Sequence, residues 1–442
     1  MKVPPFALLL VSSSFLLAFA GGTSAQPFAV TTAAGSPGLE ATVAENADGT
    51  NHHALFFSPY ALTLDSTGNL YITDGDAIRK MAPLGTNWVV TTLAGQGVYH
   101  GASDGTNSAA LFNYPQGITA DHATNLYVAD TYNNTIRRLT PSGTNWVSST
   151  LAGLAGSSGS SNGINGAARF YKPYGLTMDL AGNLYVADTY NNTIRQVSPV
   201  GTNWVVTTIA GVALLPGSAD GTNSSATFNA PAGLAMDTND NLYVADFANN
   251  TIRKMTPSGT NWVVSTLAGL AGFAGSSDGT NSSARFSQPY GVAVDSANNV
   301  YVSDSANNTI RRLKPVGTNW VVTTLAGLGG ASGAADGVGS AARFFQPYGL
   351  AVDATGALYV ADDANYTIRQ GLLAAWLQIS RLGSKVIVSW PAAFTNYLCE
   401  TNTSLSGGAW NPNTNALVIS GDYVVQTNNL GTRNAFFRLH KP

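Results

Sequence analysis

The sequence predicts an all-β fold: a six-bladed β-propeller closed by an N-terminal outer strand, plus a small C-terminal β-sandwich. The first observation is periodicity, because the tetrapeptide GTNW recurs five times between Gly85 and Trp320 at intervals of 58 residues. The second is a motif that reads LYVAD or a variant, which occurs six times. The third is composition, since 47 glycines and a charged fraction of 10% in 442 residues suit short strands and tight turns rather than helices.

The first 25 residues have the layout of a secretory signal peptide. Lys2 precedes an apolar run over residues 6–19, and small residues at sites ending in Ala20 and Ala25 suit cleavage. We therefore expect an exported protein, located outside the cell, in the periplasm or on the cell surface. No later stretch is apolar enough to predict a transmembrane segment.

Two global properties restrict the function. Cys399 is the only cysteine, which excludes an intramolecular disulfide and a cysteine-based zinc site. The net charge of −3 creates no strong electrostatic field, so binding to the phosphate backbone of a nucleic acid is not expected.

Each repeat contains four predicted strands. In the second unit they cover residues 117–121, 125–130, 135–140 and 146–153, where β-branched and aromatic residues alternate with small ones. A four-stranded unit with an apolar face cannot bury that face alone. Radial stacking of six such units therefore predicts a propeller over residues 26–374.

The sixth repeat is incomplete in a way that predicts how the ring closes. After Gly371 neither GTNW nor the following VVTTLAG occurs, but residues 27–35 match NWVVTTLAG position for position, with Phe28 in the place of Trp88. We expect this N-terminal segment to supply the outer strand of blade six, which removes an open sheet edge. The arrangement favours signal cleavage after Ala25.

The pattern changes at about residue 375. Short alternating segments separated by Gly and Asn turns predict a small β-sandwich over residues 375–442. Modules of this kind are usually adhesive, anchoring or spacer units, so we expect attachment to the cell envelope through this part.

The motifs GLAVD, NLYVAD and NNTIR resemble those of NHL-repeat propellers of the secreted bacterial type, over roughly residues 28–374. The C-terminal part loosely resembles fibronectin-like modules. The NHL resemblance implies six blades in which the first strand of each repeat lines the central channel. It also implies a top face made by the loops that enter this strand and by the loops between the second and third strands.

Some charged residues recur in every repeat. A chemical site is normally made once, so a feature made six times is expected to be structural, here an Asp–Arg network whose disruption unfolds the protein. The aspartates and arginines concerned are Asp74, Asp130, Asp188, Asp246, Asp304 and Asp362, and Arg79, Arg137, Arg195, Arg253, Arg311 and Arg369. A second aspartate in each repeat precedes a predicted Asx-stabilised turn. These are Asp65, Asp121, Asp179, Asp237, Asp295 and Asp353.

No pattern predicts catalysis. The GxSxG matches at residues 159–163 and 275–279 lie in Gly/Ser-rich loops rather than between a strand and a helix. Gluconolactonase-like and peptidyl amidating lyase propellers resemble this fold, but their channel Glu and His ligands have no counterpart on the predicted blade strands. We therefore predict no metal and no cofactor, and leave a channel calcium ion as the open alternative.

One position varies among blades while its neighbours repeat, which is typical of a binding surface on a symmetric scaffold. It lies between Pro and Gly at the start of each channel strand, and four tyrosines there would form flat, amphipathic walls for a sugar or a peptide. The alternative is that each tyrosine only fills a gap between blades. The predicted ligand-binding residues are Tyr60, Gln116, Tyr174, Tyr290 and Tyr348, with Tyr132 and Tyr190 from loops between the second and third strands; Ala232 occupies the same position in blade four.

These observations favour a secreted, non-catalytic scaffold that binds a protein or a glycan on its top face. The alternative is a metal-dependent propeller enzyme of the lactonase or lyase type, with a site in the channel. RNA binding, known for some NHL proteins, is disfavoured by the predicted export and by the absence of a basic bias.

Overall fold

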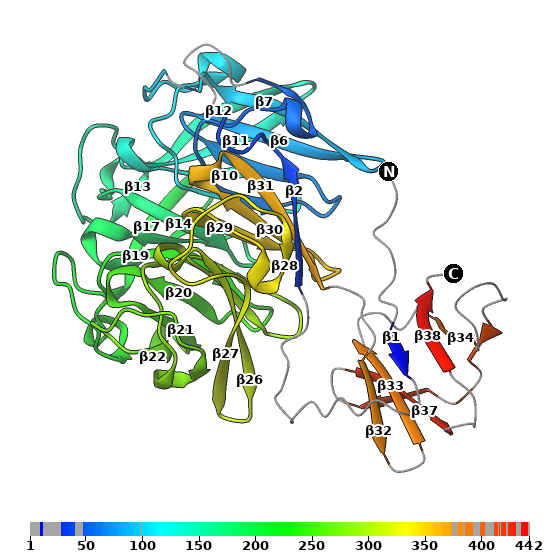
Figure 1. Cartoon of the computed structure of the whole chain (residues 1–442). Helices are drawn as coiled ribbons and strands as arrows, with labels where there is room; N and C mark the ends of the chain where they lie inside the picture. Colours follow the sequence, from blue (N-terminus) through cyan, green and yellow to red (C-terminus); the bar gives the residue numbers. More distant parts are fainter. Residues whose placement is uncertain are drawn as a thin grey trace. The chain divides into compact units, whose positions relative to one another are not determined.

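The computed structural model of the chain describes residues 9–11, 28–39, 47–97, 99–373, 378–382, 385–391, 398–402, 411–413, 415, 417–420, 423–429 and 435–440. The chain divides into two compact units, one over Phe28–Leu372 and one that combines Met1–Pro27 with Leu373–Pro442. The larger unit is a six-bladed propeller (Figure 1). The predicted all-β fold and its six blades are therefore confirmed.

Each blade is an antiparallel sheet of five strands, and the inner strands contact one another all the way round the channel. From the channel outward, blade one consists of β4 (Pro59–Leu64), β5 (Leu70–Asp74), β6 (Ala77–Leu84), β7 (Asn87–Gly95) and β3 (Gly49–Thr50). Blade two consists of β9 (Gly117–Ala120), β10 (Leu126–Asp130), β11 (Thr135–Ser142), β12 (Asn145–Gly153) and β8 (Gly105–Thr106). Blade three consists of β14 (Pro173–Met178), β15 (Leu184–Asp188), β16 (Thr193–Val200), β17 (Asn203–Gly211) and β13 (Gly163–Ile164). Blade four consists of β19 (Pro231–Met236), β20 (Leu242–Asp246), β21 (Thr251–Ser258), β22 (Asn261–Gly269) and β18 (Gly221–Thr222). Blade five consists of β24 (Pro289–Val294), β25 (Val300–Asp304), β26 (Thr309–Val316), β27 (Asn319–Gly327) and β23 (Gly279–Thr280). Blade six consists of β29 (Pro347–Val352), β30 (Leu358–Asp362), β31 (Thr367–Leu373), β2 (Phe28–Ala34) and β28 (Gly337–Val338).

Short 3-10 helices mark two places in the repeat. One follows the outermost strand of every blade, and a second connects the second and third strands in blades two to six. In blade one, Gly75 and Asp76 make this connection alone. The helices are η1 (Asn51–His53), η2 (Asn107–Ala109), η3 (Thr131–Asn133), η4 (Asn165–Ala167), η5 (Thr189–Asn191), η6 (Asn223–Ser225), η7 (Phe247–Asn249), η8 (Asn281–Ser283), η9 (Ser305–Asn307), η10 (Gly339–Ala341) and η11 (Asp363–Asn365).

The sequence motifs follow directly from burial and turn geometry. The LYVAD strand is buried at every residue, because neighbouring blades cover both faces of the sheet. The turn between the third and fourth strands contains the glycine of GTNW, whose φ is 62° at Gly143 and falls between 61° and 63° in all five copies. Glycine adopts this left-handed conformation without steric cost, which explains why the turn repeats so strictly.

The fifth strand of each blade differs from the prediction of four. A segment before the channel strand, which reads Asp104-Gly105-Thr106 in blade two, places two residues beside the fourth strand: Gly105 pairs with Ser148 and Thr106 with Val147. The asparagine that follows is in the left-handed conformation, and Asn107 Oδ1 accepts the N–H of Trp146 at 2.7 Å. A two-residue strand is too short to show an alternating pattern, so periodicity could not reveal it.

Closure of the ring by the N-terminal strand is confirmed. Strand β2 lies between β28 and β31, and Val30 pairs with Gly337 as Val90 pairs with Gly49 in blade one. Phe28 is 2% exposed, and a Cβ atom on Gly371 would lie 2.2 Å from its Cε1 atom. The other blades carry a larger apolar residue at the position of Gly371. In blade six the ring of Phe28 takes the place of that side chain.

The five tryptophans of GTNW pack between blades. Each ring meets, edge to face, the tyrosine of LYVAD in the preceding blade, with centroids 5.4–6.1 Å apart. Such pairs contribute about 0.5–1.5 kcal/mol beyond their buried area. The pairs are Trp88–Tyr359, Trp146–Tyr71, Trp204–Tyr127, Trp262–Tyr185 and Trp320–Tyr243.

The second unit contains two four-stranded sheets. Its described strands are β1 (Leu9–Val11), β38 (Ala435–His440), β34 (Leu398–Asn402) and β35 (Asn411–Pro412) in one sheet, and β32 (Gln378–Leu382), β33 (Lys385–Pro391), β37 (Tyr423–Asn429) and β36 (Leu417–Ser420) in the other. Strand β1 belongs to the predicted signal peptide, of which residues 1–8 and 12–25 lie outside the described part. Cleavage after Ala25 remains a prediction and would remove β1 from its sheet. No helix of the described chain is long and apolar enough to cross a membrane.

Candidate functional site

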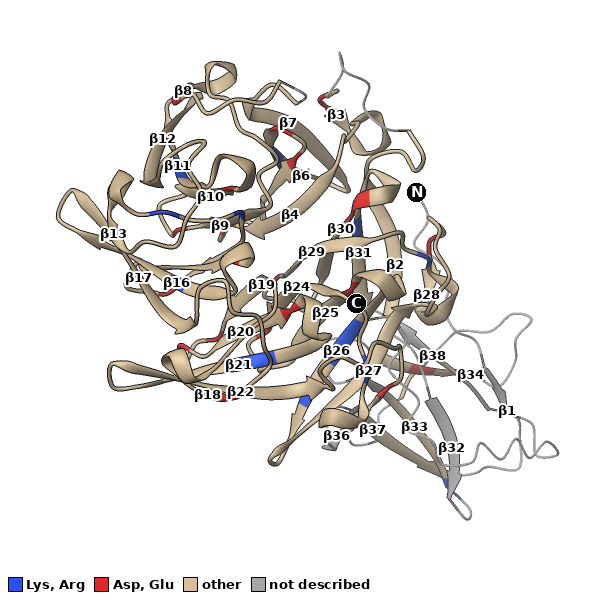
Figure 2. Cartoon of the chain, turned by 90° about the vertical axis from the view of Figure 1, so that its left-hand side faces the viewer, with Lys and Arg blue, Asp and Glu red and all other residues tan. Residues whose placement is uncertain are grey.

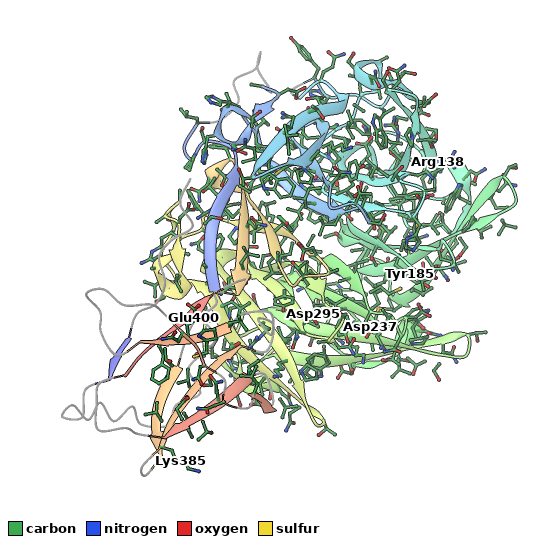
Figure 3. The ribbon with its side chains drawn as sticks, turned by 90° about the vertical axis from the view of Figure 1, so that its right-hand side faces the viewer. Arg138, Tyr185, Asp237, Asp295, Lys385 and Glu400 are labelled. Atoms are coloured by element: carbon green, nitrogen blue, oxygen red, sulfur yellow. The ribbon has the colours of Figure 1, made fainter. Side chains whose placement is uncertain are left out.

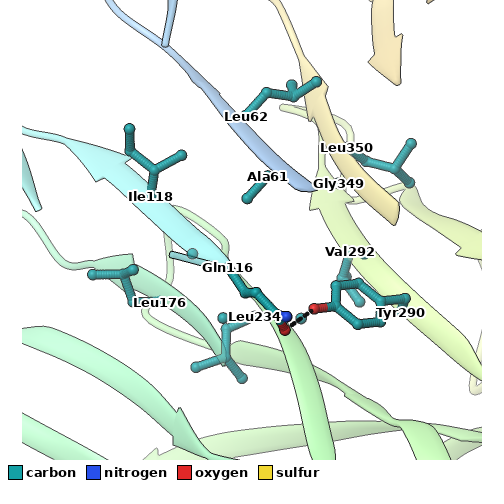
Figure 4. A pocket seen from close by; sticks show the side chains of 14 residues that line it. Ala61, Leu62, Gln116, Ile118, Leu176, Leu234, Tyr290, Val292, Gly349 and Leu350 are labelled. Atoms are coloured by element: carbon teal, nitrogen blue, oxygen red, sulfur yellow. Dashed lines mark hydrogen bonds between the residues drawn. The ribbon is translucent and has the colours of Figure 1, made fainter. Parts of the chain in front are cut away.

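The inner strands surround a small cavity in the central channel. One aliphatic side chain from each inner strand borders this cavity, whose volume is about 60 Å³ (Figure 4). Each of these side chains is only 5–7% exposed. They are Leu62, Ile118, Leu176, Leu234, Val292 and Leu350.

Glycines let the inner strands come together at the channel. A Cβ atom on Gly117 would lie 2.1 Å from the carbonyl oxygen of Tyr174 in the next blade, and four other blades show the same approach at 2.2–2.6 Å. A side chain there would push adjacent blades apart, which explains the glycine of PYG. Ala61 occupies the equivalent position in blade one.

One buried ion pair lies inside every blade. The Arg Nη1 and Asp Oδ2 atoms are 2.7–2.9 Å apart, with both side chains 0–1% exposed. The structure therefore joins the twelve charged residues predicted to be structural in six ion pairs, one in each blade. Each guanidinium also lies over a phenylalanine ring, 4.9–5.5 Å from its centroid. Burial raises the pKa of Asp188 to about 6, against the opposing effect of Arg195.

These ion pairs hold the loops that lead to the channel. In blade three, Asp188 Oδ1 accepts the backbone N–H of Tyr171 at 2.7 Å. The next residue is fixed from the preceding blade, because Asn134 Oδ1 accepts the N–H of Lys172 at 2.8 Å. Each loop that enters a channel strand in blades two to six is thus held from two blades at once.

The aspartates between the first and second strands form the expected Asx turns. Asp237 Oδ1 accepts the N–H groups of Asn239 and Asn241, both at 2.9 Å, and Asp237 Oδ2 accepts the hydroxyl of Tyr243 at 3.1 Å. Asp237 and Asp295 mark two successive turns of this kind (Figure 3). The oxygens that a calcium ion would need are therefore engaged by donors from the turn itself.

On the opposite, top face, the predicted tyrosines form a continuous circle of contacts. Tyr174, Tyr290, Tyr348 and Tyr60 follow one another with ring centroids 6.0, 4.5 and 5.6 Å apart. Tyr60 continues to Tyr114 at 6.4 Å.

The circle is completed from the loops of blades two and three. Tyr114 meets Tyr132 at 5.7 Å, and Tyr190 meets Tyr174 at 6.2 Å. The Nζ atom of Lys172 lies between them, 4.4 Å from the centroid of Tyr132 and 4.6 Å from that of Tyr190. We call this set the tyrosine ring: Tyr60, Tyr114, Tyr132, Lys172, Tyr190, Tyr174, Tyr290 and Tyr348.

The tyrosine ring closes the top of the channel. Tyr290 is 7% exposed, and its hydroxyl donates to Gln116 Oε1 at 2.9 Å across the cavity (Figure 4). Ala232, in the same sequence position, is buried as well. The top face therefore presents tyrosine side chains above the channel. The most exposed of them are Tyr132 and Tyr190, with exposed fractions of 45% and 42%.

Four tyrosines of the ring stay protonated at neutral pH. Burial raises the pKa of Tyr348 to about 12, with a further contribution from the nearby Asp363 carboxylate. Burial likewise raises the pKa of Tyr60, Tyr174 and Tyr290. Their hydroxyls therefore remain hydrogen-bond donors and add no negative charge to the top face.

Asp363 lies beside the ring, at the seam between blades six and one. Its Oδ1 atom accepts the hydroxyl of Ser58 at 2.5 Å. Burial raises the pKa of Asp363 to about 7; the Ser58 hydrogen bond opposes the rise, and the charges of Asp74 and Asp362 add to it. At the equivalent place in blades two, three and five, a neutral hydroxyl from Thr131, Thr189 or Ser305 donates to a proline carbonyl of the next blade. No sequence signal distinguished Asp363.

The structure brings all seven predicted ligand-binding residues to one face. It adds Lys172 and Tyr114, which the sequence analysis missed. Both precede the proline of the channel strand, a position occupied in turn by Ser58, Tyr114, Lys172, Ala230, Gln288 and Gln346. The variation among blades that singled out the tyrosine position would have identified this position too. Whether the tyrosines bind a ligand or only fill gaps stays a prediction.

The described residues offer little that could hold a metal. They contain no group of three or more His, Cys, Asp and Glu side chains placed to share an ion. Charged residues are spread thinly around the blades, without a broad area of one sign in the drawn view (Figure 2).

The fold and the closed circle of blades define a class: the six-bladed β-propellers. A solved propeller described as an auxiliary nutrient binding protein from Bacteroides thetaiotaomicron superposes with a TM-score of 0.58 at 20% identity, over 78% of this chain and 76% of that one. The profile of the teneurin NHL domain matches residues 203–371. The chain is a six-bladed β-propeller with repeats similar to those of NHL-repeat proteins.

Two curated relatives share the repeats. NHL repeat-containing protein 2 of Gallus gallus is 28% identical over 343 residues, which cover 70% of this chain and 46% of the relative. Protein SUPPRESSOR OF QUENCHING 1, chloroplastic, of Arabidopsis thaliana is 27% identical over 329 residues, 70% of this chain and 30% of the relative. The chain thus spans less than half the length of these relatives.

Proposed function

We propose that the protein is an exported, non-catalytic binding scaffold that holds a carbohydrate on the tyrosine ring of its top face. One observation carries the proposal: the ring joins seven tyrosines and one lysine in a circle above a channel whose cavity is only about 60 Å³. Flat aromatic faces with hydroxyl rims suit sugar rings, which have apolar C–H faces and polar edges.

The small size of the channel cavity favours surface recognition. A small-molecule enzyme site usually buries most of its substrate in a cleft, whereas here the Tyr290–Gln116 hydrogen bond spans the mouth and the cavity below is about 60 Å³. Binding then needs no opening of the propeller. The solved propeller of similar fold is described as an auxiliary nutrient binding protein, a description in keeping with this proposal; the likeness itself supports the fold alone.

A glycan array followed by calorimetry on the hits tests the proposal. We expect at least one oligosaccharide to bind, and the Tyr132→Ala/Tyr190→Ala variant to bind it about 5- to 150-fold more weakly, since each of the two aromatic contacts is worth about 0.5–1.5 kcal/mol. Because both side chains are exposed, the variant should keep its unfolding temperature. Unchanged binding in the variant would exclude the tyrosine ring as the site.

The alternative function is that of a metal-dependent lactonase- or lyase-type propeller. Its support is Asp363, a carboxyl with a pKa near neutrality at the channel mouth, which suits an acid–base group. Elemental analysis of the purified protein and hydrolysis assays with a panel of lactones separate the two functions. A stoichiometric divalent ion, together with activity lost on chelation, would overturn the binding proposal.

A further inference from the structure

We propose that Lys172, held between Tyr132 and Tyr190, is an anion subsite that selects glycans containing uronic acid residues. The inference rests on the proposed carbohydrate binding and names the chemical class of the ligand. Its basis is a half-buried ammonium group that contacts two aromatic faces and, among the described residues, takes part in no ion pair.

The position of Lys172 differs from that of the other lysines found over rings. Lys80 and Lys254 each lie over one tyrosine, at 5.9 and 5.7 Å, beside the turns at the far end of the blades. Lys172 contacts two tyrosines at 4.4 and 4.6 Å within the tyrosine ring. A cation held by two ring faces loses part of its hydration yet gains no opposite charge, so it stays able to bind an anion.

The loop presents this charge in a fixed place. The N–H of Lys172 is bound to Asn134 Oδ1, and the N–H of Tyr171 is bound to Asp188 Oδ1 of the buried ion pair. The ammonium is therefore anchored from blades two and three before any ligand arrives. Preorganisation of this kind lowers the entropy cost of binding.

Charges around the ring do not neutralise Lys172. Burial raises the pKa of Tyr60, Tyr174, Tyr290 and Tyr348, so these four hydroxyls carry no charge near neutral pH. Asp363 lies across the tyrosine ring from Lys172. It accepts the hydroxyl of Ser58 and interacts electrostatically with Tyr60 and Tyr348. Asp76 is 3% exposed and accepts the N–H of Tyr114 at 2.7 Å, so its carboxyl is engaged below the ring.

The geometry favours a carboxylated sugar over other anions. Phosphate and sulfate groups are typically held by arginine forks or several backbone N–H groups, but six arginines of this protein are buried in their blades. A single ammonium matches the single charge of a carboxylate. Tyr132 and Tyr190, on either side, can stack on the pyranose that carries it.

An acidic peptide fits the surface less well. Peptides are usually anchored in side-chain pockets or along a free sheet edge. Here the mouth is closed by Tyr290 and Gln116, and each blade ends in a strand of two residues. The repeated hydroxyl rims of the tyrosines suit a polyol better.

The test compares matched ligands in calorimetry with the full chain. The probes are oligogalacturonate, oligoguluronate and glucuronoxylan oligosaccharides, their methyl esters, and the neutral oligosaccharides of the array. We expect at least one uronate to bind, and its ester, which lacks the charge, to bind about tenfold more weakly. The Lys172→Gln variant, which introduces the residue found at Gln288 and Gln346, should bind the uronate more weakly by the same factor of about ten. The Lys172→Arg variant should retain binding.

Controls separate the possible failures. Lys254→Gln removes a lysine over a tyrosine away from the ring and should leave affinity unchanged. If neutral sugars bind as tightly and Lys172→Gln has no effect, the anion subsite is refuted while carbohydrate binding stands. If no sugar binds, both proposals fail. Binding of polyglutamate without any uronate would refute the ligand class.

Discussion

Replacement of Asp363 by asparagine is expected to stabilise the protein at alkaline pH. The asparagine keeps an oxygen that can accept the Ser58 hydroxyl, which lies 2.5 Å from the aspartate, but it removes the charge. Asp363 is largely enclosed at the seam between blades six and one, next to the carboxyls of Asp74 and Asp362. The substitution therefore isolates the cost of ionising one carboxyl at this seam.

The magnitude follows from the pKa of Asp363. Burial raises it from 3.8 to about 7 in the folded state. Below pH 4 the carboxyl is protonated in both states and its contribution to stability is fully present. As the pH rises through 7, that contribution is lost, and the difference reaches about 4 kcal/mol at most. Because the side chain is partly exposed, we expect about 2 kcal/mol or more at pH 8.

Urea unfolding followed by tryptophan fluorescence measures this effect, since five tryptophans lie at blade interfaces. The unfolding free energies of wild type and Asp363→Asn should coincide at pH 4 and diverge up to pH 8. Asp65→Asn is the control of opposite sign: burial opposes ionisation of Asp65, but hydrogen bonds from Asn69 and Thr67 lower its pKa overall. That variant should be less stable than wild type above pH 4. A pH-independent offset for Asp363→Asn, or a loss of stability at pH 8, would refute the reasoning.

Three further predictions concern the architecture. Deletion of residues 26–35 should open the ring and cost more than the ~3–5 kcal/mol expected from truncating Phe28 alone; an unchanged unfolding temperature would contradict closure by β2. Gly371→Leu should cost about 1–3 kcal/mol because its side chain meets Phe28, and a double-mutant cycle with Phe28→Ala should show coupling between the two sites. Asp188→Ala should lower the unfolding free energy by about 3–5 kcal/mol, since it leaves Arg195 buried and unpaired; a loss below 1 kcal/mol would show that the ion pair is dispensable.

The architecture was predictable because the residues that determine it recur at equivalent positions of the repeats. Six LYVAD motifs count the blades, and the match of residues 27–35 to NWVVTTLAG locates the closing strand. Each of these patterns reflects burial or turn geometry that every blade must satisfy. The fifth strand was missed because two residues, such as Gly105 and Thr106, show no alternation.

The candidate site was predictable only in part, for a related reason. Tyr60 and Tyr348 stand out because their position varies among blades, and the structure places them in one circle. The position of Lys172 varies among blades too, but its contacts with Tyr132 and Tyr190 form only in the folded propeller. The pKa of Asp363 depends on burial at the seam, a property of the closed ring rather than of any segment.

Closure by β2 also imposes an order of folding. Strand β2 precedes its partners in blade six by most of the propeller, since Thr32 bonds to Asp336, 304 residues later. Its partners in blade six exist only when almost the whole propeller has emerged, so this pairing carries a large loop-closure cost. Until then β2 has an unpaired edge that can capture the strand of another copy. We expect the slowest refolding step, and the greatest tendency to form swapped oligomers, at this seam.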